Sequence, residues 1–249
     1  MKKFNLRFFF RSWFSLFFYF FRAVIFFPYY LLLDCTDYFY TVFKFYRRNR
    51  LWWADLSLLF SYIFINPYKA CKNFLEPFPS DLVQKVYGET FFSTLEKMAN
   101  FTGLSEKDVV YELGAGRGRG CFWFRCVIGC RTIGIELNPM FVYKAQQVAK
   151  KMRWDRFEFR MINIVEVDYA DATFIYLYGS CFEQEAMLNI IKALQTCKVD
   201  TWLITVTNPL SDYTETSGFE LVHSMPARYL WGYTGVYFHR RVAEPLEKN

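Results

Sequence analysis

The 249-residue sequence predicts an α/β fold in which helices cover both faces of a mostly parallel, seven-stranded sheet, preceded by an aromatic-rich helical segment. Three observations support this prediction. Short apolar runs alternate with helical patterns from about residue 80 onward, which is typical of a parallel sheet. A glycine-rich turn, GAGRGRG at 114–120, directly follows the first of these runs. The last two runs can pair as antiparallel strands.

The individual elements follow from these runs in chain order. Strands are predicted at 108–113, 131–137, 157–163, 172–179, 201–209, 219–226 and 232–241. Helices are predicted at 121–128, 138–152 and 185–197. Asn138 is expected to cap the second helix, with Pro139 at its first position. The run at 172–179 is nearly all apolar, as a strand buried on both faces should be.

Composition and charge exclude several classes of protein. Hydrophobic residues make up 53% of the chain and charged residues 22%, which excludes global disorder. Residues 1–50 carry nine Lys or Arg against two Asp, whereas the remainder carries 21 basic against 22 acidic residues. The basic character therefore belongs to the N-terminal segment, and no general affinity for nucleic acid is expected of the rest.

The N-terminal segment has a membrane-like composition. Fourteen of the 26 residues at 8–33 are aromatic, and the stretch is long enough to span a bilayer. Arg22 in its middle and Pro28 near its end argue against a simple span. Basic residues flank both sides, so both ends are expected to stay cytoplasmic. A cleavable signal peptide fits poorly because the apolar stretch is too long and no cleavage site follows.

Two interpretations of this segment remain open. In the first, residues 8–65 form a re-entrant hairpin or interfacial helices, and the protein lies on the cytoplasmic face of a membrane. In the second, these helices cap a soluble cytoplasmic domain. A boundary is expected near residue 70, after Asn66-Pro67, which divides the chain into residues 1–70 and 71–249.

The seven cysteines form no CxxC pair and no Cys/His cluster. Cys121, Cys126 and Cys130 have a spacing that could suggest a metal cluster, but no fourth ligand is evident. Reduced, buried thiols and no metal site are expected.

The glycine turn indicates the ligand. Glu112 to Gly118 reads acidic-x-Gly-x-Gly-x-Gly. A dinucleotide fingerprint fails in every register, because its third glycine would fall at Arg119, Cys121 or Trp123, and a phosphate-binding Gly-Lys-Ser/Thr is absent. An acidic residue at the turn suits a cationic ligand and would repel a pyrophosphate. The alternative is a tight turn with a solvated glutamate.

This turn resembles motif I of the class I S-adenosylmethionine-dependent methyltransferases. Glu136 follows Gly118 by 18 residues and ends the second strand, where a carboxylate can accept hydrogen bonds from both ribose hydroxyls. The resemblance implies a Rossmann-like class I methyltransferase fold, with S-adenosyl-L-methionine as the cofactor.

A closer resemblance covers roughly residues 75–180. Val86-Tyr87-Gly88-Glu89-Thr90, placed before the motif I strand, is similar to the cofactor loop of the non-SET histone lysine methyltransferases, the disruptor-of-telomeric-silencing family. Carried over, Glu89 would bind the cofactor ammonium, Thr90 its carboxylate end, Glu136 the ribose and the Asn163-Ile164 pair the adenine. The cofactor contacts so implied are Tyr87, Glu89, Thr90, Glu112, Gly114, Ala115, Gly116, Gly118, Glu136, Leu137, Asn163 and Ile164.

The acceptor side departs from this family. A paired-Asn motif is expected after the fourth strand, and the sequence has Tyr178-Gly179-Ser180-Cys181-Phe182 instead. Tyr178 and Phe182 are the candidate catalytic residues of the methyl-transfer channel, with Trp231 and Tyr233 as further candidates. Histone specificity is therefore open. The resemblance implies protein-lysine N-methylation, and the alternatives are a small-molecule or lipid methyltransferase at a membrane and a non-catalytic membrane-bound module.

Overall fold

The computed structural model describes residues 32, 35–47, 50–77, 88–178, 182–214, 218–229 and 232–243. The chain divides into two compact units, Met1–Arg47 and Arg48–Asn249, and each is described by itself. In the first unit, helical residues 35–41 continue into a π-helix, η1 (Val42–Tyr46), in which the Phe45 ring meets the Tyr40 ring edge-on. The expectations for residues 8–31, including Arg22 and Pro28, lie outside the described residues.

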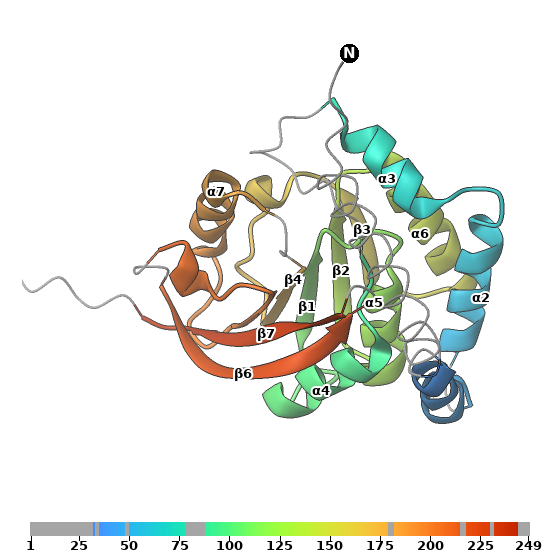
Figure 1. The fold of residues 1–249 in the computed structure, drawn as a ribbon, viewed down its shortest axis with the longest axis horizontal. Coiled ribbons are helices and arrows are strands. Elements are labelled where there is room, and N and C mark those ends of the chain that lie inside the picture. The colour runs from blue at the N-terminus through green and yellow to red at the C-terminus, as the bar shows by residue number, and fades with distance from the viewer. Residues whose placement is uncertain are drawn as a thin grey trace, which may run out of the picture. The chain divides into compact units, whose positions relative to one another are not determined.

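The second unit is built on one seven-stranded sheet with the order β3-β2-β1-β4-β5-β7-β6 (Figure 1). The strands are β1 (Val109–Leu113), β2 (Arg131–Glu136), β3 (Phe157–Met161), β4 (Phe174–Leu177), β5 (Trp202–Val206), β6 (Phe219–Tyr229) and β7 (Gly232–Arg241). The first five run parallel, and β7 runs antiparallel to both of its neighbours. The predicted mostly parallel sheet with an antiparallel end pair is confirmed.

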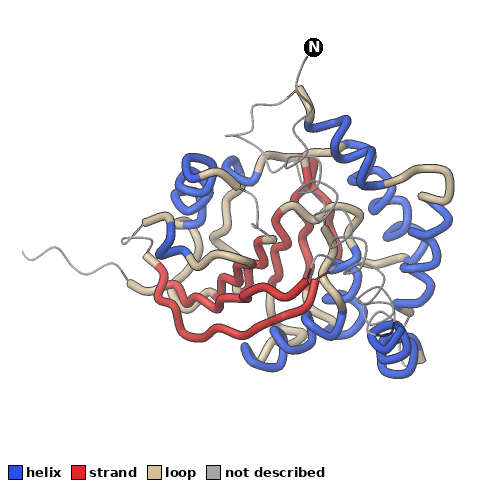
Figure 2. The backbone as a smooth tube through the Cα atoms, viewed as in Figure 1, coloured by secondary structure: helices blue, strands red, loops and turns tan. Residues whose placement is uncertain are grey.

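Helices lie on both faces of the sheet (Figure 2). They are α2 (Leu51–Ser61), α3 (Pro67–Leu75), α4 (Phe92–Thr102), α5 (Arg119–Trp123), α6 (Pro139–Met152) and α7 (Gln184–Leu194). Shorter turns are η2 (Phe124–Ile128), η3 (Ile164–Glu166) and η4 (Leu210–Asp212). On one face, Tyr111 and Leu113 of β1 share a buried cluster with Met187 and Ile190 of α7. Tyr111 and Leu113 are alternate residues of β1, so both point to the same face of the sheet and pack against α7.

Local signals in the sequence explain where the helices begin. Asn138 caps α6 as predicted, because its Oδ1 accepts a hydrogen bond from the Met140 amide at 3.0 Å. Asn66 caps α3 in the same way, accepting from the amides of Tyr68 and Lys69. Asn66-Pro67 therefore separates α2 from α3 and starts the latter.

Within the second unit, the helix α2 packs against α6. The rings of Tyr62 and Phe141 lie 6.0 Å apart, and Lys144 donates to the Ser61 carbonyl and sits 4.6 Å above the Tyr62 ring. This contact agrees with the capping interpretation for residues 51–62. The second compact unit starts at Arg48, about 20 residues before the boundary expected near residue 70. The domain division itself stays a prediction. Over the described ranges, no helix has both the length and the hydropathy needed to cross a bilayer.

Candidate active site

The turn after β1 leaves its backbone open to a cavity. Gly114, Gly116 and Gly118 all have positive φ, at 71°, 54° and 88°, a conformation that favours glycine. Both Gly114 and Ala115 donate their amides to the Ile135 carbonyl of β2, at 2.9 and 3.0 Å, which fixes the turn against the neighbouring strand. A Cβ at Gly114 would meet no atom within 4 Å, so this side of the turn faces open space.

The larger cavity, of about 520 Å³, lies where the parallel strands end. Successive strand ends contribute the predicted residues that line it: Gly114, Gly116, Glu136, Leu137, Asn163, Ile164, Tyr178 and Phe182. This position agrees with the rule that α/β sheets bind ligands beyond the carboxyl ends of their strands. The structure therefore brings eight of the predicted site residues to one cavity.

Glu136 is held rigidly at the edge of this cavity. Its Oε2 accepts from the Gly116 amide and its Oε1 from the Asn138 amide, both at 2.8 Å. Burial raises the pKa of this carboxyl, while the backbone bonds oppose that rise. Each oxygen retains a lone pair, so the carboxylate can still accept hydrogen bonds from ligand hydroxyls.

A smaller cavity, of about 20 Å³, adjoins the first and has room for about one water molecule. Gly114 and Tyr178 line both cavities, and Glu89, Thr90, Glu112 and Ala115 line the smaller one. Glu112 and Glu136 thus face adjoining parts of one cleft, as the methyltransferase interpretation requires.

Glu112 is a strongly perturbed carboxyl of the site. It is buried, and its Oε2 has no hydrogen-bond partner among the described residues. Burial raises its pKa from 4.5 to about 7, against the opposing hydrogen bonds from Cys121. Gly120 lies so close that a Cβ there would collide with the carboxylate. An unsatisfied buried carboxylate beside a cavity is suited to a cationic ligand.

Glu89 has an unexpected set of partners. Arg117 Nε donates to its Oε1 at 2.7 Å, and Arg119 Nη1 donates to its Oε2 at 3.1 Å. Arg119 also holds both carboxylate oxygens of Asp55, on α2, at 2.7 and 2.9 Å. The expected ammonium acceptor is therefore already paired with two guanidinium groups. Sequence reasoning missed Asp55 and both arginines, although the two arginines stand within the glycine motif.

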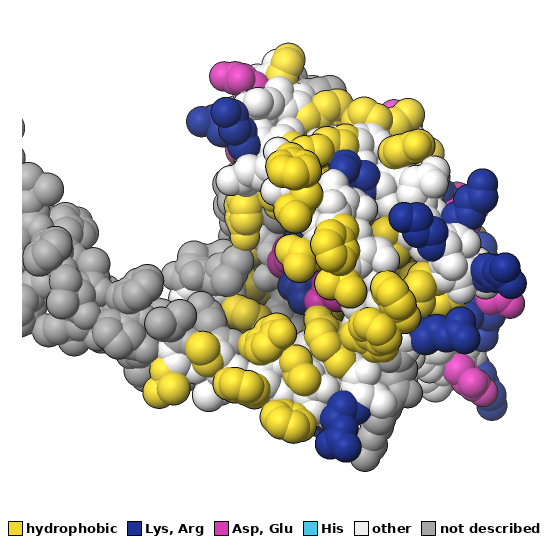
Figure 3. All heavy atoms as spheres, turned by 90° about the vertical axis from the view of Figure 1, so that its right-hand side faces the viewer, with side chains coloured by type: hydrophobic (Ala, Val, Ile, Leu, Met, Phe, Trp, Pro, Cys, Tyr) yellow, Lys and Arg dark blue, Asp and Glu magenta, His cyan; other side chains and the backbone are white. Residues whose placement is uncertain are grey.

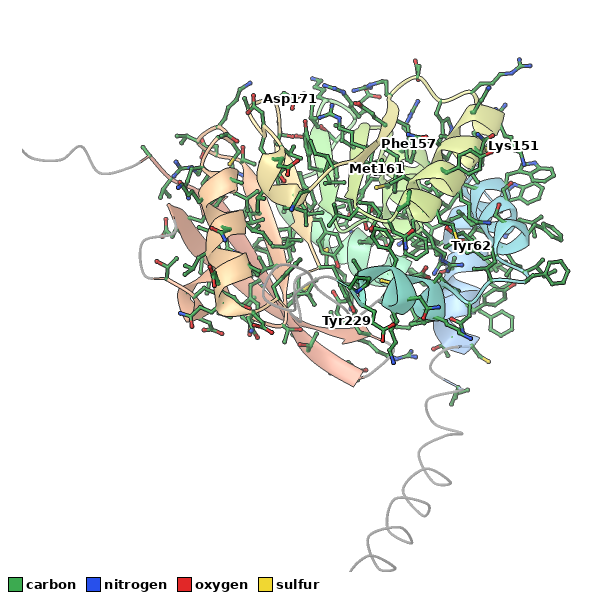
Figure 4. All side chains as sticks on the ribbon, turned by 90° about the horizontal axis from the view of Figure 1, so that it is seen from above. Tyr62, Lys151, Phe157, Met161, Asp171 and Tyr229 are labelled. Carbon is green, nitrogen blue, oxygen red and sulfur yellow. The ribbon has the colours of Figure 1, made fainter. Side chains whose placement is uncertain are left out.

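Tyrosine side chains surround Thr90. The Thr90 hydroxyl lies 2.5 Å from the Tyr176 hydroxyl, which lies 3.5 Å from that of Tyr229. The rings of Tyr229 and Tyr178 are 5.6 Å apart. Thr90 does not cap the next helix, because the N-cap of α4 is Phe91. Figure 4 shows Tyr229 on the β6–β7 side of the sheet and Tyr62 on the α2 side.

The remaining predicted residues lie elsewhere. Gly118 lines neither cavity and is the N-cap of α5 instead, and Tyr233 is 65% exposed on β7. Tyr87 and Trp231 lie outside the described residues. Within the described ranges, no group of His, Cys, Asp or Glu side chains is placed to hold a metal ion.

Several lining residues were not anticipated. One side of α7 contributes Ala186, Asn189, Ile190 and Ala193 to the larger cavity, and α3 contributes Cys71 and Leu75. The three- and four-residue spacing on α7 was visible in the sequence as an amphipathic helix. It marks a buried face, and it does not reveal that part of this face borders a cavity.

Comparison with known proteins agrees with this geometry. A family model described as histone methylation protein DOT1 matches residues 75–220, more than half of the chain. The chain belongs to the DOT1 family. An H3 lysine-79 specific histone-lysine N-methyltransferase of Dictyostelium discoideum is 22% identical over 123 residues, covering 44% of this chain and 7% of that protein. The chain thus corresponds to a small part of that relative's length.

Solved structures show the same fold. Magnesium protoporphyrin IX methyltransferase from Synechocystis PCC 6803, determined with bound S-adenosylmethionine, has a TM-score of 0.53 at 13% identity, covering 71% of this chain and 98% of its own. The [4+2]-cyclase SpnF has a TM-score of 0.53 at 12% identity, covering 62% and 83%. The predicted family, the class I methyltransferase fold and the S-adenosyl-L-methionine cofactor are confirmed. The roles of single residues in this DOT1-family domain stay predictions.

Proposed function

We propose that the chain is a protein-lysine N-methyltransferase that uses S-adenosylmethionine. The observation that carries the proposal is a pair of carboxylates, the buried Glu112 and the half-buried Glu136, at the ends of neighbouring strands on either side of an open glycine turn. The cofactor is a cation with a ribose in its middle, so it needs a negative charge near its methionine end and acceptors near its hydroxyls. The two carboxylates supply both.

The remaining cofactor contacts follow from the cavity. Asn163 and Ile164 line the side away from Glu112, where an amide and an apolar side chain suit an adenine ring. Glu89 supports cofactor binding indirectly. Its ion pairs with Arg117 and Arg119 keep the three charged side chains together beside the smaller cavity. Arg119 also lines this cavity, so a cationic side chain stands near the carboxylate end of the ligand.

The bound cofactor supplies an activated methyl group, so the protein needs to align a nucleophile at about 3–3.5 Å and exclude water. Tyr178 borders both cavities and packs on the Tyr229 ring, so we assign this alignment to Tyr178. Phe182 lines the larger cavity and would pack against the ligand. A lysine with an ordinary pKa of about 10.4 must first lose its proton, which a desolvated aromatic wall favours.

The family favours a histone lysine as the acceptor, while Tyr178 in place of the family's paired Asn predicts different surroundings for the acceptor. The cytoplasmic or membrane-facing location expected from residues 8–65 also stays a proposal. A small-molecule or lipid acceptor remains the second candidate, because the N-terminal third is apolar.

The test is labelled-methyl transfer by the full-length protein. We expect label in protein, on lysine, when nucleosomes and separate protein and lipid fractions of a lysate are offered. Replacing Glu136 by Gln should weaken cofactor binding measured by calorimetry and reduce transfer. Label confined to lipid would overturn the lysine assignment, and a folded protein that binds no cofactor would overturn the enzyme assignment as a whole.

A further inference from the structure

The helix α2 is apolar on its outward face as well as on its inward face. Leu51, Ala54 and Leu58 are buried, as expected for the side that packs inward. The outward residues are also apolar, with Trp53 50% exposed and Phe60 63% exposed. The charged residue of α2, Asp55, turns inward to Arg119. A helix at the surface of a soluble protein normally presents polar residues to water, so this outward face is suited to a second apolar environment.

The apolar face continues beyond the helix. We use the name aromatic surface for eight exposed residues of this region: Trp52, Trp53, Leu59, Phe60, Ile63, Phe64, Ile65 and Tyr68. Figure 3 shows hydrophobic side chains spread across this side of the molecule, with Lys and Arg mainly around the margins. Single exposed apolar residues are common, whereas a contiguous patch marks a binding surface.

The chemistry of the aromatic surface fits a lipid better than a protein. The side chains of its eight residues offer three polar groups, two indole N–H groups and one phenol. Protein interfaces usually form more hydrogen bonds than three side-chain groups can supply. Trp and Tyr are enriched where a membrane meets water, and Arg50, Lys69 and Lys72 are exposed next to the surface and can attract anionic headgroups. The sequence upstream has the same character, with 14 aromatic residues at 8–33.

We propose that the aromatic surface seats in the headgroup–acyl boundary of an anionic phospholipid bilayer, with α2 lying along the membrane plane. Figure 4 shows side chains on α2 projecting away from the sheet, as this docking requires. None of the eight residues of the aromatic surface lines the larger cavity, so lipid bound to that surface would leave the cofactor cleft unfilled. The proposal is independent of the identity of the methyl acceptor.

The test uses full-length protein and vesicles of phosphatidylcholine with or without phosphatidylserine. We expect the protein to co-sediment with the vesicles, more strongly when they contain phosphatidylserine. Replacing Trp53, Phe60 and Phe64 together by Gln should weaken partitioning by at least about 30-fold, because three large side chains lose their apolar environment. The control replaces Leu188, Val199 and Leu221 by Gln, which are exposed apolar residues of other elements, and should partition like the wild type.

A second readout keeps the result independent of folding. Brominated lipids should quench the wild-type tryptophan fluorescence more than that of a Trp52→Phe, Trp53→Phe variant. Cofactor binding by both triple variants, measured by calorimetry, reports that each is folded. Unchanged vesicle binding by the Trp53, Phe60 and Phe64 variant would overturn the proposal. Wild-type protein that does not bind vesicles would also overturn it, and dimers of the wild type that this variant abolishes would assign the aromatic surface to a second copy of the chain.

Discussion

At the scale of residues, the site contains two carboxylates that are wholly or partly withdrawn from solvent. Glu136 compensates for its burial with hydrogen bonds from Gly116 and Asn138, whereas Glu112 keeps an oxygen without a partner among the described residues. A buried charge without a partner destabilises the folded protein unless a ligand supplies the opposite charge. We therefore expect Glu112 to lower the stability of the unliganded protein, and a cationic ligand to recover that stability.

This imbalance predicts an unusual pH dependence of stability. The pKa of Glu112 is about 7 in the folded protein against 4.5 for an ordinary Glu, so the folded state holds the proton more tightly. The stability contribution of the protonated carboxyl is full below pH 4.5 and is lost as the pH rises through about 7, by about 3 kcal/mol. We expect Glu112→Gln to be more stable than the wild type at pH 8 in urea unfolding. Identical pH profiles for the two proteins would contradict this.

The same carboxyl predicts how cofactor affinity changes with pH. A cationic ligand binds the ionised form of Glu112, so affinity should rise between pH 6 and pH 8, by up to about tenfold. Calorimetric titration of the wild type and of Glu112→Gln measures this, and the variant should bind more weakly at pH 8 with a flatter pH profile. Weaker wild-type binding at pH 8 than at pH 6 would show that Glu112 does not meet the cation.

At the scale of elements, α2 joins the site through one ion-pair chain. Asp55 holds Arg119, which with Arg117 holds Glu89, and all four side chains are largely shielded from solvent. The chain connects residues 28 to 64 positions apart. The helix α2 thus supports the glycine turn from outside the predicted methyltransferase domain.

Removing the carboxylate of Asp55 should weaken cofactor binding. Asp55→Asn leaves the Arg119 guanidinium with one carboxylate partner fewer, and we expect a loss of about 1–2 kcal/mol of stability together with weaker cofactor binding. The matched control is Asp155→Asn, which breaks the pair with Arg125 at an 81% exposed side chain and should leave both quantities unchanged. Chemical unfolding and calorimetry measure the two effects, and equal effects of the two substitutions would contradict a special role for α2.

Most of the strands, and the helix α6, were predictable because the residues within each element indicate it. The strands are short apolar runs and α6 carries its own cap, so β1, β2 and α6 end within about a residue of the expected positions. The expected end of β6 at Pro226 was too early, because this strand lies at the edge of the sheet and continues to Tyr229. An edge strand tolerates a missing N–H where that position faces solvent.

The site was predictable only in part, for a related reason. The glycine turn, Glu112 and Glu136 belong to one βαβ unit, so their proximity follows from the chain order. The Asp55–Arg119 pair, the lining by α3 and the tyrosines around Thr90 join segments that are distant in sequence. Such contacts depend on the packing of several layers, which no local pattern records.

At the scale of the whole molecule, cofactor binding should stabilise the sheet-bearing unit as one body. The cavity is lined from β1 to α7, so an occupant links elements across the sheet. At a concentration about 100 times its Kd, S-adenosylmethionine should add about 2.7 kcal/mol, which raises the Tm by about 5 °C or more. A thermal melt measures this, with ATP as a control that the acidic turn should reject. An equal shift with ATP would contradict the charge argument for this turn.

The edge strand β6 also determines how copies of this protein avoid one another. Its outer side carries Pro226, and its pairing is interrupted by a bulge between Leu221 and His223. Proline and bulges deny an incoming chain the unbroken row of amides that edge-to-edge growth requires. Concentrated protein is therefore protected from cross-β aggregation at this edge of the sheet. If the protein precipitates and lipid or detergent prevents this, the contact responsible lies on its helices and not on β6.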